Sequence, residues 1–196
     1  MRPGHLLAAA VLAAALPHTA PAQDAARGAG LAADRCSACH GADGRSQIPD
    51  IPSLAGQQAG FITLQMILIR EGIRHVPAMA AVAQGMPDRD IEDLAAYFAS
   101  LPPAPPEDRR PRDAALASAG EALIGPRLCG VCHLPSLTGR DQIPRIVAQH
   151  EDYLARAMTE YRDGRRVGAD AQMNGAMVGL SDADIAALAH YLAHRD

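Results

Sequence analysis

The sequence predicts an all-α protein built from two tandem domains that a proline-rich linker joins. Three observations support this prediction. The pentapeptide pattern C-x-x-C-H occurs at 36–40 and again at 129–133, and helix-compatible segments follow each copy in the same order. Between the two halves, five prolines stand within 101–111, where they favour an extended backbone over a helix. A chain of 196 residues has room for two domains of roughly 80 residues each, as duplication of one small domain would give.

The N-terminus has the pattern of a secretory signal peptide. Arg2 precedes an apolar run over 6–16, and a small-residue cleavage pattern stands at 20–22. A run of eleven apolar residues is too short to span a bilayer, so we expect cleavage after Ala22 and export of the rest; retention as an uncleaved anchor is the alternative. The expected boundaries are a signal peptide over 1–22, an N-terminal domain over 23–101, a Pro-rich linker over 102–113 and a C-terminal domain over 114–196.

The composition is acidic and poor in aromatic residues. The chain has no Lys, and without Arg2 its 17 Arg face 22 Asp and Glu, which gives the exported part a net charge of about −5. No basic stripe is present, which argues against nucleic acid as a partner. With two Phe, four Tyr and no Trp, two small domains are short of large core side chains, and a bound apolar group would complete the cores.

Two helices are expected in the first part of the N-terminal domain. Helix-compatible residues over 24–35 run directly into the first C-x-x-C-H motif, and a glycine turn at 41–44 and a Pro-containing loop at 48–52 follow it. Apolar residues three and four positions apart predict the next helix over 60–71, and Gly72 is its stop signal.

A loop and a further helix complete the first half. The loop contains His75, Pro77 and Met79 and leads to Pro87. A helix is then expected to about Ser100, because apolar residues recur at helical spacing along one face. That apolar stripe comprises Ile91, Leu94, Ala95 and Phe98.

The second half repeats this order. Helix-compatible residues over 113–124 precede the second motif, and 143–146 echo the Pro-containing loop of the first half. Ser181 is the expected N-cap of the final helix. The apolar stripe of that helix comprises Ile185, Leu188, Ala189 and Leu192.

The two C-x-x-C-H motifs carry the chemistry that the sequence predicts. Two thiols three positions apart with an imidazole directly after them are the pattern for covalent attachment of a haem c, in which the histidine becomes the proximal ligand of the iron. A structural zinc site would need the two cysteine pairs to converge on one metal, and a redox dithiol would need a surrounding βαβ pattern that is absent. The predicted attachment residues are Cys36, Cys39, Cys129 and Cys132, and the predicted proximal ligands are His40 and His133.

A sixth iron ligand should occupy matching positions in the two halves. Aligning the last helices at an offset of 94 residues places Met79 over Met173. A thioether is a soft, neutral ligand that raises the reduction potential and closes the iron to substrates. Met66 and Met158 also match, but they lie on helical stripes, where methionine commonly fills a core. The sequence therefore predicts Met79 and Met173 as the sixth ligands.

Other side chains remain open as alternatives for the sixth ligand. On the same alignment Met86 meets Leu180 and Met177 meets Ala83, so neither methionine has a counterpart in the other half. His75 lies four residues before Met79 and is a further alternative ligand.

Residues around the predicted ligands have expected roles as well. Pro52 and Pro144 follow the motif histidines by 12 and 11 residues, and their carbonyls are the expected acceptors for the histidine Nδ1–H; an ordinary role in turns is the alternative. Arg74, Arg165 and Arg166 either pair with haem propionates or are solvated. Three histidines with helical-surface spacing are expected to be solvated: His150, His190 and His194.

Taken together, these residues resemble the dihaem class I c-type cytochromes, and most closely the cytochrome c4 family. The resemblance covers nearly all of the chain after the signal segment and is carried by 36–44, 52–57, 90–98 and 180–185. It implies two all-α domains that meet face to face, with two covalently bound haem c groups whose propionates meet at the interface. It also implies a periplasmic carrier, associated in some members with the inner membrane, that passes single electrons from a quinol-oxidising or dehydrogenase complex to a terminal oxidase.

The second half departs from the family pattern at three places. Leu134 and Pro135 follow His133 where the family usually has a glycine turn. The pair at 125–126 is Gly-Pro, which interrupts the approach to the motif, and Ala148 stands where the first half has glycine. The second haem pocket is therefore expected to be the less regular one.

Three functions fit these patterns. A one-electron carrier with two His/Met haems is the leading prediction, and it is not an enzyme. The alternative is a dihaem cytochrome subunit of a dehydrogenase such as flavocytochrome c sulfide dehydrogenase. A dihaem enzyme, such as a peroxidase or a thiosulfate dehydrogenase, needs an exchangeable iron ligand, and the matching methionines argue against one.

Overall fold

The computed structural model describes residues 23–107, 109–166 and 171–195, and this part of the chain is helical with no β-strand. The all-α prediction is therefore confirmed. The signal peptide predicted over 1–22 lies outside the described residues. The helices of the first half are α1 (Ala25–Arg35), α2 (Ser37–His40), α3 (Ala59–Arg70), α4 (Pro77–Ala83) and α5 (Asp88–Ser100). Those of the second half are α6 (Ala114–Ile124), α7 (Cys129–His133), α8 (Glu151–Arg162), α9 (Gln172–Met177) and α10 (Asp182–Ala193).

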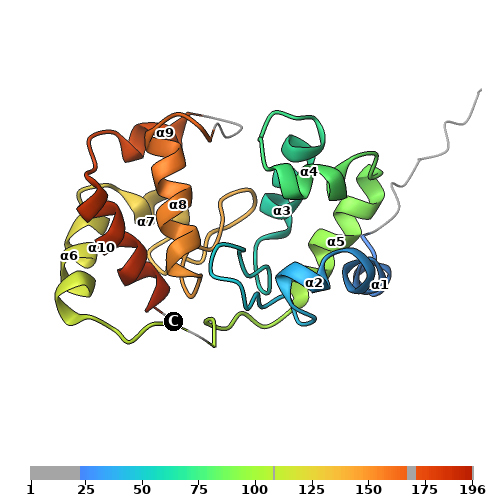
Figure 1. The fold of residues 1–196 in the computed structure, drawn as a ribbon, viewed down its shortest axis with the longest axis horizontal. Helices are drawn as coiled ribbons and strands as arrows, with labels where there is room; N and C mark the ends of the chain where they lie inside the picture. Colours follow the sequence, from blue (N-terminus) through green and yellow to red (C-terminus); the bar gives the residue numbers. More distant parts are fainter. Residues whose placement is uncertain (1–22, 108, 167–170, 196) are drawn as a thin grey trace, which may run out of the picture.

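The helices form two halves that lie side by side, each around its own hydrophobic core (Figure 1). In the first half α1 and α3 pack on α5, and in the second half the equivalent helices α6 and α8 pack on α10. The same packing of equivalent helices is what duplication of one domain produces. The first core comprises Ala32, Cys36, Ile62, Met86, Ile91, Leu94, Ala95 and Phe98. The second core includes Leu137, Met158, Met177, Ile185 and Leu188.

Side-chain caps fix where the outer helices begin. Asp24 and Asp113 are equivalent N-caps, and their carboxylates accept backbone N–H groups from the first turns of α1 and α6. Ser181 caps α10 in a reciprocal capping box with Asp184, as the sequence predicts. Because these caps satisfy N–H groups that the helix leaves unpaired, each helix begins within one residue of its expected start.

Close helix crossings define both domains. At Gly28 an added Cβ would lie 2.0 Å from the Asp93 carbonyl oxygen, and at Gly120 it would lie 2.1 Å from the Ala187 carbonyl oxygen. The two glycines occupy equivalent places, where α1 crosses α5 and α6 crosses α10. The absence of a side chain therefore lets the helix backbones approach to contact in each half.

The short helices differ most from the sequence-based expectation. The longest described helix, α5, has 13 residues, and no helix of the described ranges is both long and apolar enough to cross a membrane. Residues 77–83, predicted as a loop, form α4, which Pro77 begins at a position where its missing N–H breaks no helical hydrogen bond. The interruption predicted at Gly125 is present, because α6 ends at Ile124 and a turn separates it from α7.

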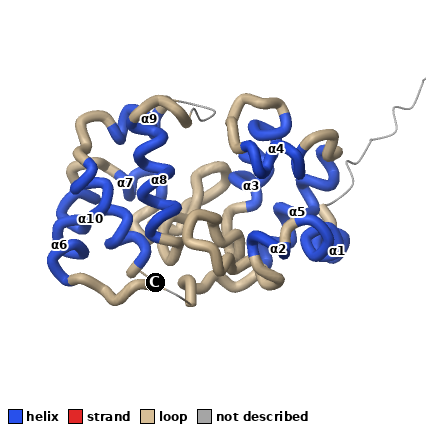
Figure 2. Tube along the Cα trace, viewed as in Figure 1, coloured by secondary structure: helices blue, strands red, loops and turns tan. Residues whose placement is uncertain are grey.

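The loops of the two halves meet between the helical parts of the molecule (Figure 2). His150 Nε2 lies 2.9 Å from the Ser46 carbonyl oxygen, and Arg156 donates to the Asp50 carbonyl oxygen at 2.7 Å. Both hydrogen bonds join residues that are about a hundred positions apart in the chain, so the interface has specific polar contacts.

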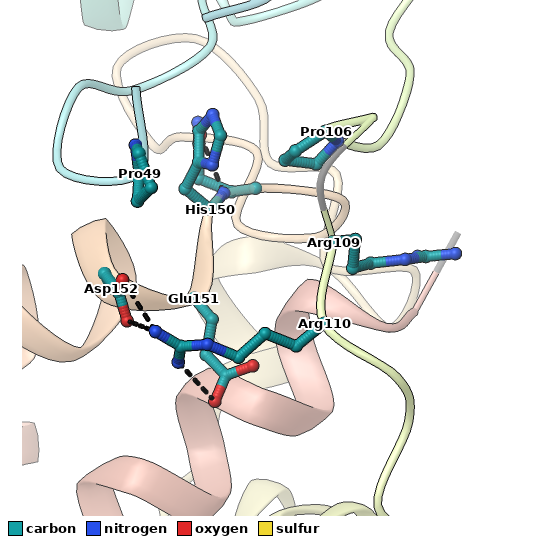
Figure 3. A pocket seen from close by; sticks show the side chains of 8 residues that line it. Pro49, Pro106, Arg109, Arg110, His150, Glu151 and Asp152 are labelled. Carbon is teal, nitrogen blue, oxygen red and sulfur yellow. Dashed lines mark hydrogen bonds and ion pairs between the residues drawn. The ribbon is translucent and has the colours of Figure 1, made fainter. Parts of the chain in front are cut away.

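The linker is docked along the C-terminal half (Figure 3). The Arg110 guanidinium donates to Asp152 at 2.9 Å, and the Arg110 carbonyl oxygen lies 2.8 Å from His194 Nε2. The Asp113 N–H donates to His190 Nε2 at 2.8 Å. A cavity of about 90 Å³ lies between the linker, the loop of the first half and the start of α8. The linker is therefore anchored by hydrogen bonds as well as stiffened by its prolines.

The expectation that His150 and His190 are solvated is wrong. His150 is 4% exposed and His190 is 3% exposed, while His194 is half-buried. The loop of the first half covers His150, and the linker covers His190. These are contacts between distant segments, which helical spacing alone does not reveal.

The crossing of α1 and α5 predicts a large difference between two glycine-to-alanine substitutions in one helix. Gly28→Ala should lower the free energy of unfolding by about 1–3 kcal/mol or more, because its Cβ forces the two backbones apart. Gly30→Ala is the matched control, since its Cβ meets nothing within 4 Å, and it should be neutral or stabilising by up to about 1 kcal/mol. Thermal or chemical denaturation measures both, and equal stabilities for the two variants would contradict the crossing.

Candidate haem sites

The first C-x-x-C-H motif lies where α1 passes into α2. Cys36 is the C-cap of α1 and the N-cap of α2, and His40 is the last residue of α2. His40 is buried, and its Nδ1 lies 2.8 Å from the Pro52 carbonyl oxygen. The loop that presents Pro52 is held by the Gly44 carbonyl, which accepts two backbone N–H groups just beyond the proline. Two structural elements thus bring the imidazole and the carbonyl together.

The second motif repeats this geometry on different local structure. Cys129 begins α7, and His133 ends it and is buried. The Nδ1 of His133 lies 2.8 Å from the Pro144 carbonyl oxygen. Here the loop is held by the buried Leu137, whose carbonyl accepts the N–H of residue 146. Both contacts expected for the two prolines are therefore present, and their role in orienting an iron ligand stays a prediction.

The proline carbonyls determine which form the two imidazoles adopt. A carbonyl oxygen can only accept, so Nδ1 of His40 and of His133 carries the proton and donates it, which leaves Nε2 as the nitrogen that can bind a metal. Burial lowers the pKa of both histidines, and the hydrogen bond to proline opposes this effect without overcoming it. A neutral ring with a fixed tautomer is the form that ligates iron.

The cysteines lie in two separate places. Cys36 belongs to the core of the first half, and Cys129 packs against the core of the second. No disulfide joins any of the four cysteines. Because the two cysteine pairs do not converge on one point, the arrangement excludes one shared zinc site and fits two independent thioether attachments.

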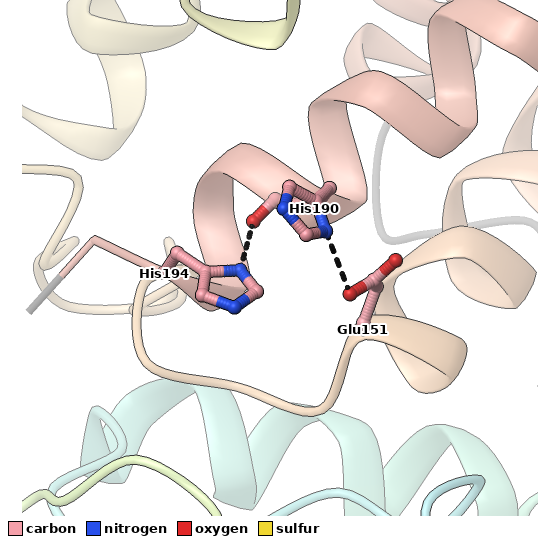
Figure 4. Close-up of side chains that lie close together, drawn as sticks. All are labelled: Glu151, His190 and His194. Carbon is pink, nitrogen blue, oxygen red and sulfur yellow. Dashed lines mark hydrogen bonds and ion pairs between the residues drawn. The ribbon is translucent and has the colours of Figure 1, made fainter. Parts of the chain in front are cut away.

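One cluster of metal-ligand type occurs in the described part of the chain, and it contains no cysteine (Figure 4). Its three members, Glu151, His190 and His194, bring their ligand atoms within 4.8 Å of one another. His190 accepts the Asp113 N–H at Nε2, so its Nδ1–H donates to Glu151 at 3.0 Å. His194 Nδ1 lies 2.8 Å from the His190 carbonyl oxygen. These nitrogens already have protein partners, and the cluster serves to anchor the linker.

The methionines fall into two groups. Met86 is 2% exposed and Met177 is 3% exposed, and each belongs to a hydrophobic core. Met79 on α4 and Met173 on α9 are half-buried and are in equivalent short helices. Met86 and Met177 are therefore core side chains, whereas Met79 and Met173 are only partly buried, with Met173 at the edge of the second core. The assignment of Met79 and Met173 as iron ligands stays a prediction.

Basic side chains converge between the halves, at the ends of α3 and α8. A cavity of about 330 Å³ there is lined by Arg74, His75, Glu160, Arg165 and Arg166. Arg74 donates to Gln65 at 2.7 Å, and Arg166, from the other half, lies 3.4 Å from the same oxygen. Arg165 is exposed and pairs with Asp163 instead. Two of the three arginines considered for propionate binding thus meet in one place.

This arginine pair has unused capacity for an anion. Arg166 is 5% exposed, and its Nε has no hydrogen-bond partner. Burial and the neighbouring Arg166 lower the pKa of Arg74. Burial opposes the ionisation of Tyr153, but Arg166 and Arg74 favour it and bring its pKa down to about 8. A buried Arg166 with an unpaired N–H beside the half-buried Arg74 would be stabilised by carboxylates, so the residues present fit the propionates of haems bound on either side.

Backbone strain marks the second site. Gly41 follows His40 with φ 81° and ψ 151°, and the equivalent Leu134 adopts φ 68° and ψ 159°. This region of backbone conformation is essentially restricted to glycine. Ala148 likewise has φ 54° where Gly56 has φ 67°. The second pocket therefore keeps the backbone path of the first despite side chains that disfavour it.

Sequence reasoning missed the interface residues beside these sites. Gln57 and Gln149 are buried, and each donates to and accepts from the backbone of the opposite half. Both lie five residues after the proline that faces the motif histidine. Their matching positions in the repeat are the signal that could have identified them.

The family model described as cytochrome c matches residues 25–102 and 117–196, once in each half. Cytochrome c4 from Pseudomonas aeruginosa is 38% identical over 182 residues, which cover 87% of this chain and 88% of that protein. The crystal structure of reduced recombinant cytochrome c4 from Pseudomonas stutzeri superposes with a TM-score of 0.82 at 35% identity and covers 89% of this chain and 100% of that chain.

A relative with a different name is also similar. The thiosulfate dehydrogenase electron acceptor of Stutzerimonas stutzeri is 30% identical over 184 residues, which cover 85% of this chain and 82% of that protein. The matches to both named groups cover at least 85% of this chain, so the likeness extends over both halves rather than over one domain.

The strained backbone predicts that Leu134→Gly stabilises the protein. Relief of a glycine-type conformation held by leucine should raise the free energy of unfolding by about 1 kcal/mol or more, offset in part by the greater freedom of glycine in the unfolded chain. Denaturation of the variant beside the unchanged protein measures this. Gly41→Leu is the reverse control and should destabilise, because its Cβ would lie 2.0 Å from the Arg45 carbonyl oxygen. A destabilised Leu134→Gly variant would contradict the geometry.

The methionine assignment predicts a spectroscopic difference between two neighbouring substitutions. Met79→Ala should abolish the near-infrared sulfur-to-iron band of one haem and leave that of the other unchanged. Met86→Leu, in the same domain, should keep both bands and cost less than about 1.5 kcal/mol of stability, because it conserves volume in the core. An unchanged spectrum in Met79→Ala, or loss of a band in Met86→Leu, would refute the assignment.

Proposed function

The chain belongs to the cytochrome c family and carries two covalently bound haem c groups, and from this premise we propose that it is a periplasmic shuttle for single electrons. In this role it takes electrons from a quinol-oxidising or dehydrogenase complex and delivers them to a terminal oxidase. The observation that carries the proposal is the repeated pair of a buried histidine and a proline carbonyl, one in each half.

The residues of the chain suit a carrier better than a catalyst. A haem c whose two axial positions are both filled supplies a change of iron valence without the making or breaking of bonds. His40 and His133 would hold the iron through Nε2, the four motif cysteines would fix the porphyrins covalently, and Met79 and Met173 would close the remaining face. Arg74 and Arg166 would bind propionates between the domains, which would place the two groups close enough for electrons to pass.

Export to the periplasm is part of the proposal. The signal-peptide pattern over 1–22 supports it, as does the resemblance to cytochromes whose haem is attached on the outer side of the inner membrane. Association with the inner membrane would then arise through the redox partners.

A second candidate function is that of dedicated electron acceptor for a dehydrogenase. The similarity to a thiosulfate dehydrogenase electron acceptor over 85% of this chain favours it. Both candidates use the same two haem sites and differ only in the partner that docks. A flavin-containing sulfide dehydrogenase would be a partner of the same class.

The carrier function predicts two closed, reversible one-electron centres. Potentiometric titration with visible and near-infrared detection should give two one-electron transitions per molecule, and the reduced protein should not bind carbon monoxide. A variant with Cys36→Ala and Cys39→Ala is the control, since it lacks attachment in the first half and should take up one electron. Carbon monoxide binding by the unchanged protein would overturn the carrier function in favour of an enzyme with an exchangeable ligand.

The partner is tested by the direction and speed of electron transfer. The oxidised protein is mixed with thiosulfate dehydrogenase and thiosulfate, and the reduced protein is mixed with membranes that contain a terminal oxidase. Rapid oxidation by the membranes is expected for the shuttle. Reduction by the dehydrogenase without oxidation by the membranes would instead identify a dedicated acceptor.

A further inference from the structure

Two buried glutamines make reciprocal contacts across the domain interface. The side chain of Gln149 accepts the Ser53 N–H at 2.9 Å and donates to the Ser53 carbonyl oxygen at 2.9 Å. The side chain of Gln57 accepts the Arg145 N–H at 2.8 Å and donates to the Arg145 carbonyl oxygen at 3.0 Å. Each amide therefore binds both polar groups of one backbone residue in the opposite half.

A local hydrogen bond restricts the side-chain conformation of each glutamine. The Gln149 oxygen also accepts the N–H of His150 at 3.0 Å, and the Gln57 oxygen accepts the N–H of Gln58 at 2.9 Å. Each side chain is thus folded back onto its own backbone and has little rotational freedom. Because both are buried, loss of either amide would leave buried backbone groups without hydrogen-bond partners.

The backbone N–H that each glutamine binds belongs to the same peptide group as a proline carbonyl at a haem site. The Ser53 N–H and the Pro52 carbonyl form one peptide group, and the carbonyl accepts the Nδ1–H of His40 at 2.8 Å. The continuous path is therefore glutamine oxygen, peptide N–H, peptide carbonyl and imidazole N–H. The second half has the equivalent path, which is formed by Gln57, Arg145, Pro144 and His133.

A peptide group bonded at both ends transmits polarisation. Because the C–N bond has partial double-bond character, donation by the N–H to an acceptor increases the negative charge on the carbonyl oxygen. Chains of hydrogen bonds in a low-dielectric interior strengthen one another by about 10–30% per bond. A stronger carbonyl acceptor draws the Nδ1 proton away from the imidazole and makes its Nε2 a more basic metal ligand.

We propose that Gln149 and Gln57 are positioning residues that act across the interface, each orienting and polarising the axial histidine of the opposite domain. Gln149 acts on His40, and Gln57 acts on His133. The inference rests on the proposed function only in that these histidines ligate the iron. Its consequence is that docking of the domains sets the potential of each haem, since a more basic ligand favours ferric iron.

Because each glutamine acts on the haem of the opposite domain, its substitution should shift the potential of that haem most. Local disruption of the substituted domain would instead shift the potential of that domain's own haem most. Gln149→Leu should raise the reduction potential of the N-terminal haem, so that its ferric-to-ferrous ratio at a fixed potential falls about threefold, while the C-terminal haem moves less. Gln57→Leu should raise the reduction potential of the C-terminal haem and move the N-terminal haem less. Spectroelectrochemical titration of the full-length holoprotein gives the potentials, and hyperfine-shifted proton signals of the axial histidines assign them to domains.

Two matched variants complete the design. Gln149→Glu keeps an oxygen acceptor for the Ser53 N–H, so it should leave the N-terminal potential unchanged or lower it, opposite in sign to Gln149→Leu. Arg156→Lys keeps the charge of that side chain but replaces the guanidinium that makes a different interface hydrogen bond, to the Asp50 carbonyl, and should shift neither haem. If Gln149→Leu does not fold, Gln149→Glu and Gln57→Leu still show the direction of the potential shift and which domain's haem shifts more.

The outcomes separate this inference from the proposed function. A larger shift in the haem of the substituted domain, equal shifts in both haems, or no shift would overturn the inference while both irons keep histidine ligation. Absence of low-spin axial-histidine signals from the unchanged protein would instead overturn the ligand assignment on which the proposed function depends.

Discussion

The hydrogen bond from a buried imidazole to a proline carbonyl is the contact on which the rest of this structure depends. His40 and His133 each donate Nδ1–H to the carbonyl of Pro52 or Pro144 at 2.8 Å. The bond fixes the tautomer with the proton on Nδ1, and burial, which lowers the pKa of both rings, keeps them neutral. The helix that ends at the histidine and the loop that carries the proline must both be in place for it to form. Much of each small domain therefore serves to hold one ring in one orientation.

The sequence predicted what depends on local pattern and on the repeat. The motif residues, the N-cap at Ser181 and the main helices follow from residue type and spacing, and the structure has them within about one residue. The helix at 77–83 could not be predicted, because seven residues are too few to show a period. The burial of His150 and His190 depends on the opposite domain and on the linker, which helical spacing does not contain.

The domain interface contains residues that contact both candidate haem sites or lie between them. Arg74 and Arg166 meet there with unused capacity for an anion, and Gln57 and Gln149 bind the peptide groups next to the proline carbonyls. Each set joins the two halves, since Arg74 and Arg166 share the Gln65 oxygen and each glutamine binds a backbone residue of the opposite half. The second half keeps the backbone path of the first even where Leu134 occupies a glycine-type conformation. The second half therefore accepts backbone strain and keeps the same geometry around its histidine.

The central claim is that each half holds one iron between an imidazole and a thioether. Proton NMR of the fully reduced holoprotein tests it most directly, because a methionine bound to a low-spin haem iron lies over the ring and its methyl signal moves far upfield. We expect two such methyl signals, one for Met79 and one for Met173. A single signal, or none, would contradict it and would indicate that at least one iron has a different or exchangeable ligand.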